Sequence, residues 1–589
     1  MVIVMAASSR TGVESHSWSK WQIALVVGAP VAIGLGYWYL KNSGSHSDKE
    51  KCQSGGKKKG SQVVQSTNNG SARGAGDVNS KSHQNETVDA RKGSFDQAQD
   101  YKKEGNKHFK DGKFSDAIKC YNAAIEACPK DKVYDLSTFY QNRAAAYEQL
   151  GDYESAKNDC TLALQLNPVY VKALHRRAKA YELTKDLKSC LEDVTAACLL
   201  DHFQNQASIA MADRVLRELG QQHAKDAMAK RGPVIPSKHF VRTYFSSFNN
   251  DPITSQPDEP NKNEPVVNGE TEPKRGFLLA KEALLKQRYH EIIPACTEEI
   301  NSENSKYKME ALLLRGTFYL LRGEHNLVYQ DLEKIIENES VDVKIRVNAL
   351  IKRASLHMQK DDPMKTIQDF DRAAELGPHL SDVYHHRGQV YLLMDKVDEA
   401  LADFRKAVDI SPDFPIAYVQ KCYADYRYAN TQRDSEASKK ALESFEIAIA
   451  KFPKCAECFT LYAQVLIEQQ EYQKSDDCYK KAIEVDPENA TLHVHRGLLQ
   501  LNWNGNVDKA ITYIKKALEM DDKCEFAYET LGTIEVQRGN FLAGVELFDK
   551  AIQLVKTELE MSHLFSLKDA AKAQAVVIEK YKIPIPTND

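Results

Sequence analysis

The sequence predicts an all-α fold, a right-handed solenoid of about eleven helix pairs, and three observations support this prediction. The chain is similar to itself with a period of about 34 residues. Within each period, small and aromatic residues recur at fixed offsets. The composition, with 28% charged and 42% hydrophobic residues, is typical of a globular protein. The net charge of −4 argues against a general nucleic-acid binder.

The repeat is clearest where small, aromatic and proline residues follow one another at the offsets of the tetratricopeptide pattern: Gly388, Tyr391, Ala400, Phe404, Ala407 and Pro412. A small residue at repeat position 8 lets two antiparallel helices approach, and aromatic residues at positions 11 and 24 fill the space between them. The register is followed through the position-8 residues Gly105, Ala144, Ala178, Ala280 in a degenerate unit, Gly316, Ala354, Gly388, Cys422, Ala463, Gly497 and Gly532. Each unit buries its apolar face against its neighbours, so a continuous solenoid is expected.

The front of the chain predicts a membrane anchor. After a short segment, 1–20, residues 21–40 read WQIALVVGAPVAIGLGYWYL and carry no charge. About 20 helical residues match a hydrocarbon core of about 30 Å. Trp18, Trp21 and Trp38 flank this run as an interfacial belt. A cleaved signal peptide is the alternative, but the run is long and ends in bulky residues, which favours a retained anchor.

The flanking charges predict the orientation of this anchor. More lysines follow the run than precede it, including Lys57, Lys58 and Lys59, so the large C-terminal part is expected in the cytosol. Residues 41–94 are rich in Ser, Gly, Asn, Lys and Gln and predict a disordered basic tether. A second boundary is expected at 246–275, a Pro-rich acidic linker between an N-terminal domain, 95–245, and a C-terminal domain, 276–589.

The cysteines indicate a reducing compartment. There are twelve, most of them within the repeats, and no disulfide framework is implied. Cys455 and Cys458 form a C-x-x-C motif, which could be a redox pair or half of a zinc site. No second C-x-x-C and no Cys/His pair follow at metal-ligand spacing, so no metal or cofactor is predicted.

The first three repeats carry a candidate binding site. In each unit the first helix lines the concave face through positions 2, 5, 6, 9, 12 and 13, which we call the inward positions. Cations and amides occupy five of them: Lys102, Asn106, Asn142, Lys172 and Arg176. Three cations and two amides suit the paired carboxylates of a chain end and its last acidic side chain. Single basic residues are common on solvated helix faces, but five at these positions favour a site.

These five residues resemble the carboxylate clamp of chaperone-binding tetratricopeptide domains, which holds the Glu-Glu-Val-Asp terminus of heat-shock chaperones. The segments KKEGN, YQNRAAAY and KALHR carry this resemblance. With the anchor, the tether and the C-terminal segment FAYETLGTIEVQRGN, the whole chain resembles the seventy-kilodalton receptor family of the mitochondrial outer-membrane translocase. The resemblance implies a location in that membrane. It also implies that chaperones of the seventy- and ninety-kilodalton classes deliver presequence-less preproteins, which pass to other translocase subunits.

The inward positions of the later repeats predict a second surface, in which carboxylates alternate with apolar residues. Its candidate residues are Glu457, Leu461, Leu498, Glu525, Phe526 and Glu529. Such a surface suits amphipathic targeting segments that carry Lys or Arg. The alternative is that the two leucines only pack adjacent helices. By the family resemblance, the three glutamates lie in the preprotein groove.

Enzymatic function is not indicated. The sequence has no P-loop, no G-x-S-x-G and no H-E-x-x-H motif. His385 and His386 fall at inward positions without a carboxylate or cysteine partner at suggestive spacing, which favours groove-lining residues over catalysts. The alternative to an import receptor is a membrane-anchored co-chaperone scaffold, for example at the endoplasmic reticulum, which needs the clamp but no preprotein groove.

Overall fold

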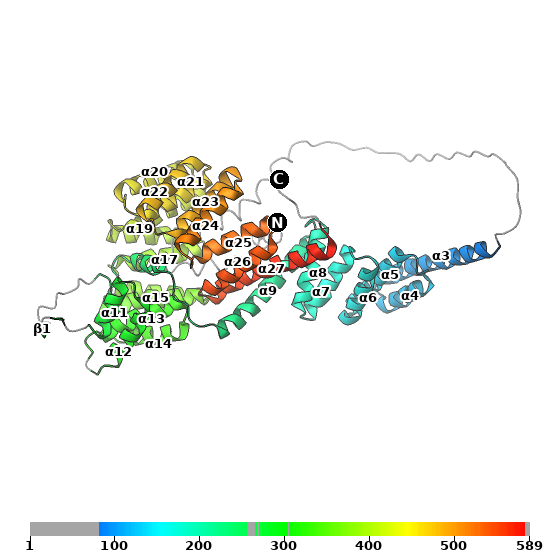
Figure 1. Ribbon diagram of the computed structural model, residues 1–589, viewed down its shortest axis with the longest axis horizontal. Coiled ribbons are helices and arrows are strands. Elements are labelled where there is room, and N and C mark those ends of the chain that lie inside the picture. Colours follow the sequence, from blue (N-terminus) through cyan, green and yellow to red (C-terminus); the bar gives the residue numbers. More distant parts are fainter. Residues whose placement is uncertain (1–81, 256–265, 268–269, 272–273, 304, 584–589) are drawn as a thin grey trace.

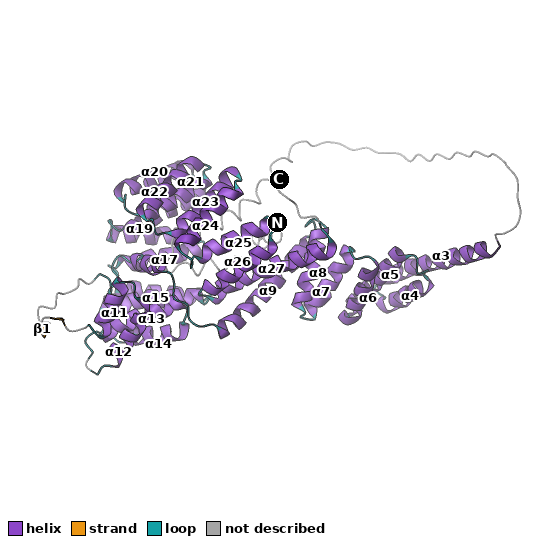
Figure 2. Ribbon diagram, viewed as in Figure 1, coloured by secondary structure: helices purple, strands orange, loops and turns teal. Residues whose placement is uncertain are grey.

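The computed structural model describes residues 82–255, 266–267, 270–271, 274–303 and 305–583 (Figure 1). The predicted anchor, 21–40, lies outside these residues. Among the helices that are described, none is long and apolar enough to cross a membrane. The described residues are helical nearly throughout, which confirms the predicted all-α repeat fold (Figure 2).

The described helices include eleven antiparallel pairs in chain order, and each of the eleven predicted position-8 residues lies in the first helix of a pair. The pairs are α3(Ser82–Lys110)–α4(Phe114–Ala127), α5(Val133–Leu150)–α6(Tyr153–Leu166), α7(Val171–Leu183)–α8(Leu187–Leu200), α11(Gly276–Leu285)–α12(Ile292–Asn301), α13(Lys308–Arg322)–α14(His325–Ile336), α15(Val343–Gln359)–α16(Pro363–Leu376), α17(Ser381–Leu393)–α18(Val397–Ile410), α19(Pro415–Gln432)–α20(Ser435–Lys451), α21(Ala456–Glu468)–α22(Tyr472–Val485), α23(Ala490–Asn504)–α24(Val507–Met520) and α25(Glu525–Gln537)–α26(Phe541–Leu554). The repeat register predicted from the sequence is therefore confirmed.

Three helices stand outside these pairs. They are α9(Gln206–Lys230), α10(Lys238–Ser246) and the last helix, α27(Glu558–Tyr581). Among the described residues, one 3-10 turn, η3(Tyr289–Glu291), precedes α12. The strands β1(Val266–Val267) and β2(Glu270–Thr271) pair antiparallel, with Val266 opposite Thr271. This strand pair is the one departure from the all-α prediction within the described chain.

Close helix approach explains the glycines at position 8. A Cβ atom added to Gly105 would lie 2.7 Å from the Tyr121 ring, and one added to Gly532 would lie 2.8 Å from the Phe548 ring. These rings are themselves buried, with exposed fractions of 2% and 0%. The aromatic residue of the second helix thus packs directly on the backbone of the first, and a larger residue at position 8 would force the pair apart.

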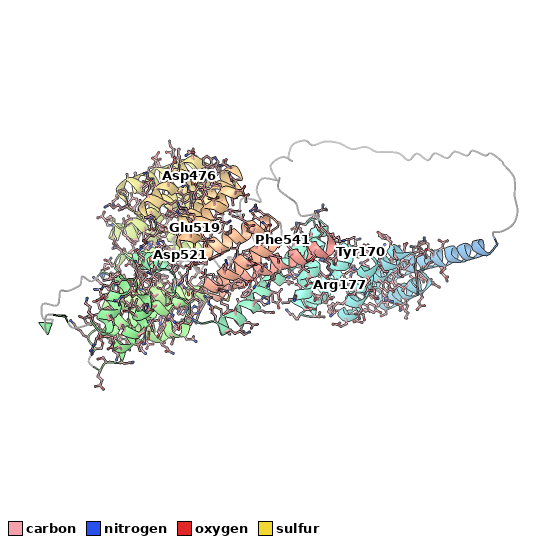
Figure 3. The ribbon with its side chains drawn as sticks, in the orientation of Figure 1. Tyr170, Arg177, Asp476, Glu519, Asp521 and Phe541 are labelled. Carbon is pink, nitrogen blue, oxygen red and sulfur yellow. The ribbon has the colours of Figure 1, made fainter. Side chains whose placement is uncertain are left out.

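A buried ion pair recurs inside the repeats, joining an arginine of the first helix to an aspartate of the second. In α17 and α18, Arg387 Nε and Nη2 donate to the two carboxylate oxygens of Asp403 at 2.7 and 2.8 Å. The same contact is made by Arg143–Asp159, Arg177–Asp193, Arg315–Asp331 and Arg353–Asp369. A related pair, Arg496–Asp476, joins α23 to α22 of the preceding repeat. Figure 3 labels Arg177 and Asp476, from two of these pairs. The bidentate contact fixes the relative position of the two helices in the five pairs that contain it.

The last helix joins the two ends of the folded chain. α27 packs along α9, so the end of the predicted C-terminal domain contacts the end of the predicted N-terminal domain (Figure 1). Ser566 Oγ donates to the Leu216 carbonyl at 2.9 Å, and His223 Nδ1 lies 2.8 Å from Asp569 Oδ2. One apolar cluster contains Leu216 and residues of α8, α9, α26 and α27. The packing between these helices holds the first repeats against the last ones.

Two predicted boundaries are corrected by the structure. α3 begins at Ser82, inside the segment 41–94 that was expected to be a disordered tether. The first part of the predicted linker, 246–275, is partly buried: Ser247, Phe248, Asp251 and Ile253 are buried, whereas Asn250 is exposed. The linker was predicted from the prolines and acidic residues of this stretch. Its aromatic and apolar residues, such as Phe248 and Ile253, pack into the core instead.

Candidate functional site

The two amides of the predicted clamp lie next to each other on adjacent repeats. Asn142 Nδ2, on α5, donates to Asn106 Oδ1, on α3, at 3.3 Å. The same oxygen accepts a hydrogen bond from Tyr121 Oη at 2.8 Å. Since α3 contacts α5 and α5 contacts α7, the first helices of the three repeats form one continuous surface. The structure therefore brings these two predicted residues together, with both side chains half-buried.

Arg176, on α7, extends this surface, but its guanidinium is already paired with an acidic residue. Its Nε donates to Glu148 Oε2 at 2.8 Å, and its Nη1 donates to the Gln141 carbonyl at 3.3 Å. Lys179 also donates to Glu148, at 2.7 Å. Burial by itself raises the pKa of the Glu148 carboxyl, but the hydrogen bonds from Lys179 and Arg176 outweigh it and the pKa is lowered. Glu148 is therefore an ionised partner of Arg176 and Lys179.

The two lysines of the predicted clamp differ in their surroundings. Lys102 is half-buried; its Nζ donates to Gln99 Oε1 at 3.1 Å and lies 5.7 Å from the centre of the Phe139 ring. Lys172 is exposed at the start of α7. It follows Tyr170, labelled in Figure 3, whose hydroxyl donates to Gln141 Oε1 at 3.3 Å. Lys172 can thus reach a ligand without breaking a contact.

In the C-terminal repeats, the inward positions of repeats six and seven are occupied by the chain itself. Residues 238–253, comprising α10 and the turn after it, lie against α13, α15 and α17; we call this stretch the inner segment. Lys352 Nζ, on α15, pairs with Asp251 Oδ2 at 3.3 Å, and both side chains have an exposed fraction of 0%. The backbone N–H groups of Asn249 and Asn250 donate to the two carboxylate oxygens of Asp382 at 2.7 and 2.9 Å. A ligand cannot use these positions while the inner segment is in place.

The histidines at inward positions are buried rather than poised for catalysis. Burial lowers the pKa of His386 to about 3 and that of His495 to about 3. The His386 ring lies 4.4 Å from the Phe248 ring of the inner segment, and its Nδ1 lies 3.2 Å from Gln389 Oε1. His385 is fully buried, and neither of its ring nitrogens has a hydrogen-bond partner in the described chain. At neutral pH these imidazoles are uncharged.

Of the residues predicted for the second surface, Glu457 is the one with an unsatisfied polar atom. Its Oε1 is buried and has no hydrogen-bond partner among the described residues. Burial, followed by the nearby Cys455 thiol, raises the pKa of this carboxyl well above its ordinary value. Leu461 and Leu498 have exposed fractions of 3% and 8%. In this conformation the two leucines mainly fill the space between helices.

The other two glutamates of this surface pair with basic residues of the last helix and of the loop before it. Glu525 Oε1 lies 3.5 Å from Lys556 Nζ, and Glu529 Oε1 lies 3.2 Å from His563 Nε2. Phe526 is half-buried, and its ring lies 5.3 Å from that of His495. Glu525 and Glu529 are one turn apart on α25, whereas Glu457 stands on α21, two helix pairs earlier. The acidic trio is therefore split between an unpartnered carboxyl and two paired ones.

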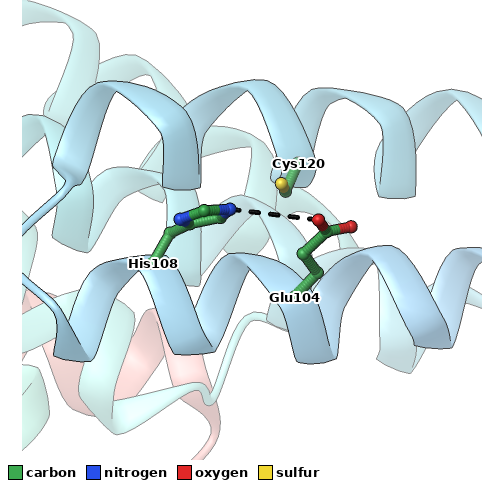
Figure 4. Close-up of side chains that lie close together, drawn as sticks. All are labelled: Glu104, His108 and Cys120. Atoms are coloured by element: carbon green, nitrogen blue, oxygen red, sulfur yellow. Dashed lines mark ion pairs between the residues drawn. The ribbon is translucent and has the colours of Figure 1, made fainter.

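One group of side chains in the described chain could hold a metal ion. Glu104 and His108 on α3 and Cys120 on α4 place a carboxylate oxygen, an imidazole nitrogen and the thiol within 4.8 Å of one another (Figure 4). His108 Nε2 lies 3.9 Å from Glu104 Oε1. Burial and the Glu104 charge raise the pKa of the Cys120 thiol, which disfavours the thiolate form that binds metals. Glu104 and His108 are one helical turn apart, and this spacing is sufficient to account for the arrangement.

Two functional features were missed by the sequence reasoning. Glu148 stands at position 12 of its repeat, an inward position, so the register that selected Asn142 could also have found it. Lys352, at position 6 of repeat six, was detectable in the same way. Its partner Asp251 was not, because it lies outside any repeat and no period relates the two residues.

The fold and the inward polar residues define a tetratricopeptide-repeat protein. Family models agree: the "Tetratricopeptide repeat" model matches residues 137–168 and 381–414, and the "TPR repeat" model matches residues 463–502. These ranges lie in repeats two, seven, nine and ten of the register above.

Curated relatives identify the family. The chain is 46% identical over 576 residues to the mouse "Mitochondrial import receptor subunit TOM70", covering 96% of this chain and 93% of the relative. It is 47% identical over 576 residues to the human protein of the same name, covering 96% and 94%. A solved structure, "Crystal Structure of the Yeast Tom70", is 24% identical and covers 83% of this chain and 99% of its own, with a TM-score of 0.46. The chain belongs to the TOM70 family of mitochondrial import receptor subunits.

Proposed function

We propose that this protein is a receptor of the mitochondrial outer membrane that docks cytosolic chaperones through repeats one to three and binds their preprotein clients in the C-terminal repeats. It has no enzymatic activity of its own and uses no cofactor. Chaperones of the seventy- and ninety-kilodalton classes, presequence-less preproteins and other translocase subunits are its partners. Family membership supports the receptor role, whereas the partners follow from the chemistry of the two surfaces.

The row formed by Asn106, Asn142 and Arg176 across α3, α5 and α7 is the observation that carries the chaperone-docking role. Two amides and a guanidinium on one surface offer the directional donors that a terminal carboxylate accepts. Lys172 is exposed beside this row, and Lys102 flanks it on α3. Charge-assisted hydrogen bonds of this kind contribute about 1.5 to 3 kcal/mol each.

A pair of peptides tests this docking role. A peptide ending in Glu-Glu-Val-Asp should bind the full chain in calorimetry, and the same peptide with an amidated C-terminus should bind at least about tenfold more weakly, since one charge-assisted contact is lost. Equal affinities for the two peptides would contradict a carboxylate clamp. The family membership would stand in either case.

The client-binding role is assigned to repeats eight to eleven, because the inner segment covers the inward positions of repeats six and seven. Glu457 supports this assignment, since its buried Oε1, which has no hydrogen-bond partner among the described residues, gains a hydrogen bond when a ligand group reaches it. Phe526 packs against the His495 ring and offers an aromatic surface to the apolar side chains of a client. Glu525 and Glu529 can exchange Lys556 and His563 for the basic residues of an amphipathic client segment.

The triple replacement of Glu457, Glu525 and Glu529 by Gln tests the client surface. It should weaken binding of a basic amphipathic peptide and flatten the salt dependence of that binding. Chaperone-peptide affinity should not change, because distant sites are usually independent. Wild-type client affinity together with a wild-type salt slope would remove these residues from the site.

The membrane topology is proposed from the sequence. Residues 21–40 form a single-pass anchor in the outer membrane, and the repeats face the cytosol because the cations lie mainly after the apolar run. Protease added to intact mitochondria should remove the repeats. Their protection from protease would overturn this topology.

A further inference from the structure

The C-x-x-C motif lies at the N-terminus of α21, where helix geometry brings its two cysteines together. Cys455 is the N-cap residue, with φ −103° and ψ 104°, and Cys458 is the third residue of the helix. The side chains of an N-cap residue and of the third helical residue face each other, as they do in a capping box. The Cys458 N–H donates to the Cys455 carbonyl at 3.2 Å, and Cys455 packs against the apolar cluster that contains Cys458.

The two thiols differ in access. Cys455 is half-buried, whereas Cys458 has an exposed fraction of 0% and belongs to an apolar cluster with Cys422 and Phe445. An accessible thiol beside a buried one is the arrangement that an attacking and a resolving cysteine require. None of the cysteines in the described chain forms a disulfide, so both thiols are free to react.

The surroundings favour the thiolate at Cys455. Contact with the Cys458 thiol lowers the pKa of Cys455, burial opposes this effect, and the backbone N–H groups of Cys458 and Glu457 lower the pKa further. Burial and the neighbouring Cys455 raise the pKa of the intervening Glu457 well above its ordinary value. Cys120 is also half-buried, but burial and the charges of Glu104 and Asp116 raise its pKa. Cys120 thus serves as an internal reference of similar access and lower reactivity.

We infer that Cys455 and Cys458 form a reversible dithiol–disulfide site that is oxidised by peroxides and reduced by small dithiols. The Cys455 thiolate attacks one oxygen of hydrogen peroxide, the O–O bond breaks, and the products are Cys455 sulfenic acid and hydroxide, which is protonated to water. The Cys458 sulfur then attacks the sulfenic sulfur, the S–O bond breaks, and its proton leaves with the hydroxide as a second water. The dithiol loses two electrons and the peroxide gains them.

The site is independent of the proposed chaperone and preprotein binding. It is a modification site at the start of one repeat, set by the local geometry of α21, and it requires no ligand of the receptor. Because Glu457 lies between the two cysteines, the disulfide would form beside the unpartnered carboxyl of the client surface.

Peptide mapping of the full chain tests the inference. The reduced protein is treated with a small excess of hydrogen peroxide, denatured and blocked with N-ethylmaleimide. Trypsin cleaves after Lys454 and Lys474, and the resulting peptide contains Cys455 and Cys458 but no other cysteine. We expect this peptide to lose two hydrogens and take up no maleimide, at a peroxide dose that leaves Cys120 reduced. Dithiothreitol should restore both maleimide adducts.

Three variants separate the chemistry from folding. Cys455→Ser should abolish the oxidation while keeping α21, because serine is a favoured N-cap residue. Cys458→Ser should stop the reaction at the sulfenic acid of Cys455, which dimedone captures. Cys478→Ser, which changes a half-buried cysteine on α22, should leave the disulfide unaffected. Full maleimide labelling of Cys455 and Cys458 at a dose that oxidises Cys120, or a cross-link from Cys458 to Cys422, would overturn the inference.

Discussion

Lys352 and Asp251, 101 residues apart in the chain, form an ion pair in which both side chains are fully buried. The Lys352 ammonium lies 4.5 Å from the centre of the Phe248 ring and also contacts Asn348 Oδ1. Burial lowers the pKa of Lys352, and the Asp251 carboxylate opposes that shift. The pair fixes the inner segment in the C-terminal repeats.

Removing one member of this pair should destabilise the protein strongly. In Asp251→Ala the Lys352 ammonium stays buried without its partner, and breaking a buried pair in this way costs about 3 to 5 kcal/mol. The urea midpoint should fall accordingly. Asp100→Ala, which removes a pair whose side chains are both 74% exposed, should leave the midpoint nearly unchanged. A midpoint for Asp251→Ala equal to that of Asp100→Ala would contradict the buried-pair assignment.

The buried histidines should make stability depend on pH. His495 has a folded pKa of about 3 against an ordinary value of 6.5, so the unfolded state binds more protons between these values. The contribution of His495 to the free energy of unfolding is fully present above pH 6.5 and is lost as the pH falls toward 3. His495→Gln should reduce the decline measured by thermal unfolding between pH 6.5 and 4. His290→Gln, with a side chain that is 75% exposed, should not. Identical profiles for the two variants would refute the prediction.

Glu148 should compete with a bound chaperone peptide for Arg176. Arg176→Ala should weaken binding of a Glu-Glu-Val-Asp peptide by about tenfold or more, because a charge-assisted contact is lost. Glu148→Gln should tighten binding by about two- to fivefold, since a partly exposed pair no longer holds the guanidinium. Calorimetry measures both. The control is Glu182→Gln, which removes the partner of Arg214 instead. A weaker peptide affinity in Glu148→Gln would contradict the prediction and show that Glu148 positions Arg176.

The glycine at position 8 of the last repeat should not tolerate a methyl group. Gly532→Ala would place Cβ 2.8 Å from the Phe548 ring and 3.3 Å from the Gly544 carbonyl oxygen, an overpacking that costs about 1 to 3 kcal/mol. Gly93→Ala has nothing within 4 Å of the new Cβ and should stabilise α3 by about 0.5 to 1 kcal/mol. Opposite shifts of the urea midpoint are expected, and a stabilising Gly532→Ala would contradict the close packing.

The sequence alone determined the repeat architecture, because a tetratricopeptide unit is specified by local spacing. Residues that contact each other across a pair, such as Gly105 and Tyr121, lie within the same helix pair. Their spacing in the sequence therefore indicates which helices pack together. The clamp amides Asn106 and Asn142 could be predicted for the same reason, since their repeat positions place them on adjacent first helices.

The tertiary structure decided what no period encodes. The inner segment lies against the inward positions of repeats six and seven, where Asp251 forms an ion pair with Lys352. The helix α27 packs on α9 through contacts such as the hydrogen bond from Ser566 to the Leu216 carbonyl. These contacts join residues far apart in sequence and outside the repeats, so local spacing carries no information about them. Whether an inward residue is open to a ligand, as Lys172 is, or already paired, as Arg176 is, likewise depends on neighbours that only the folded chain brings near.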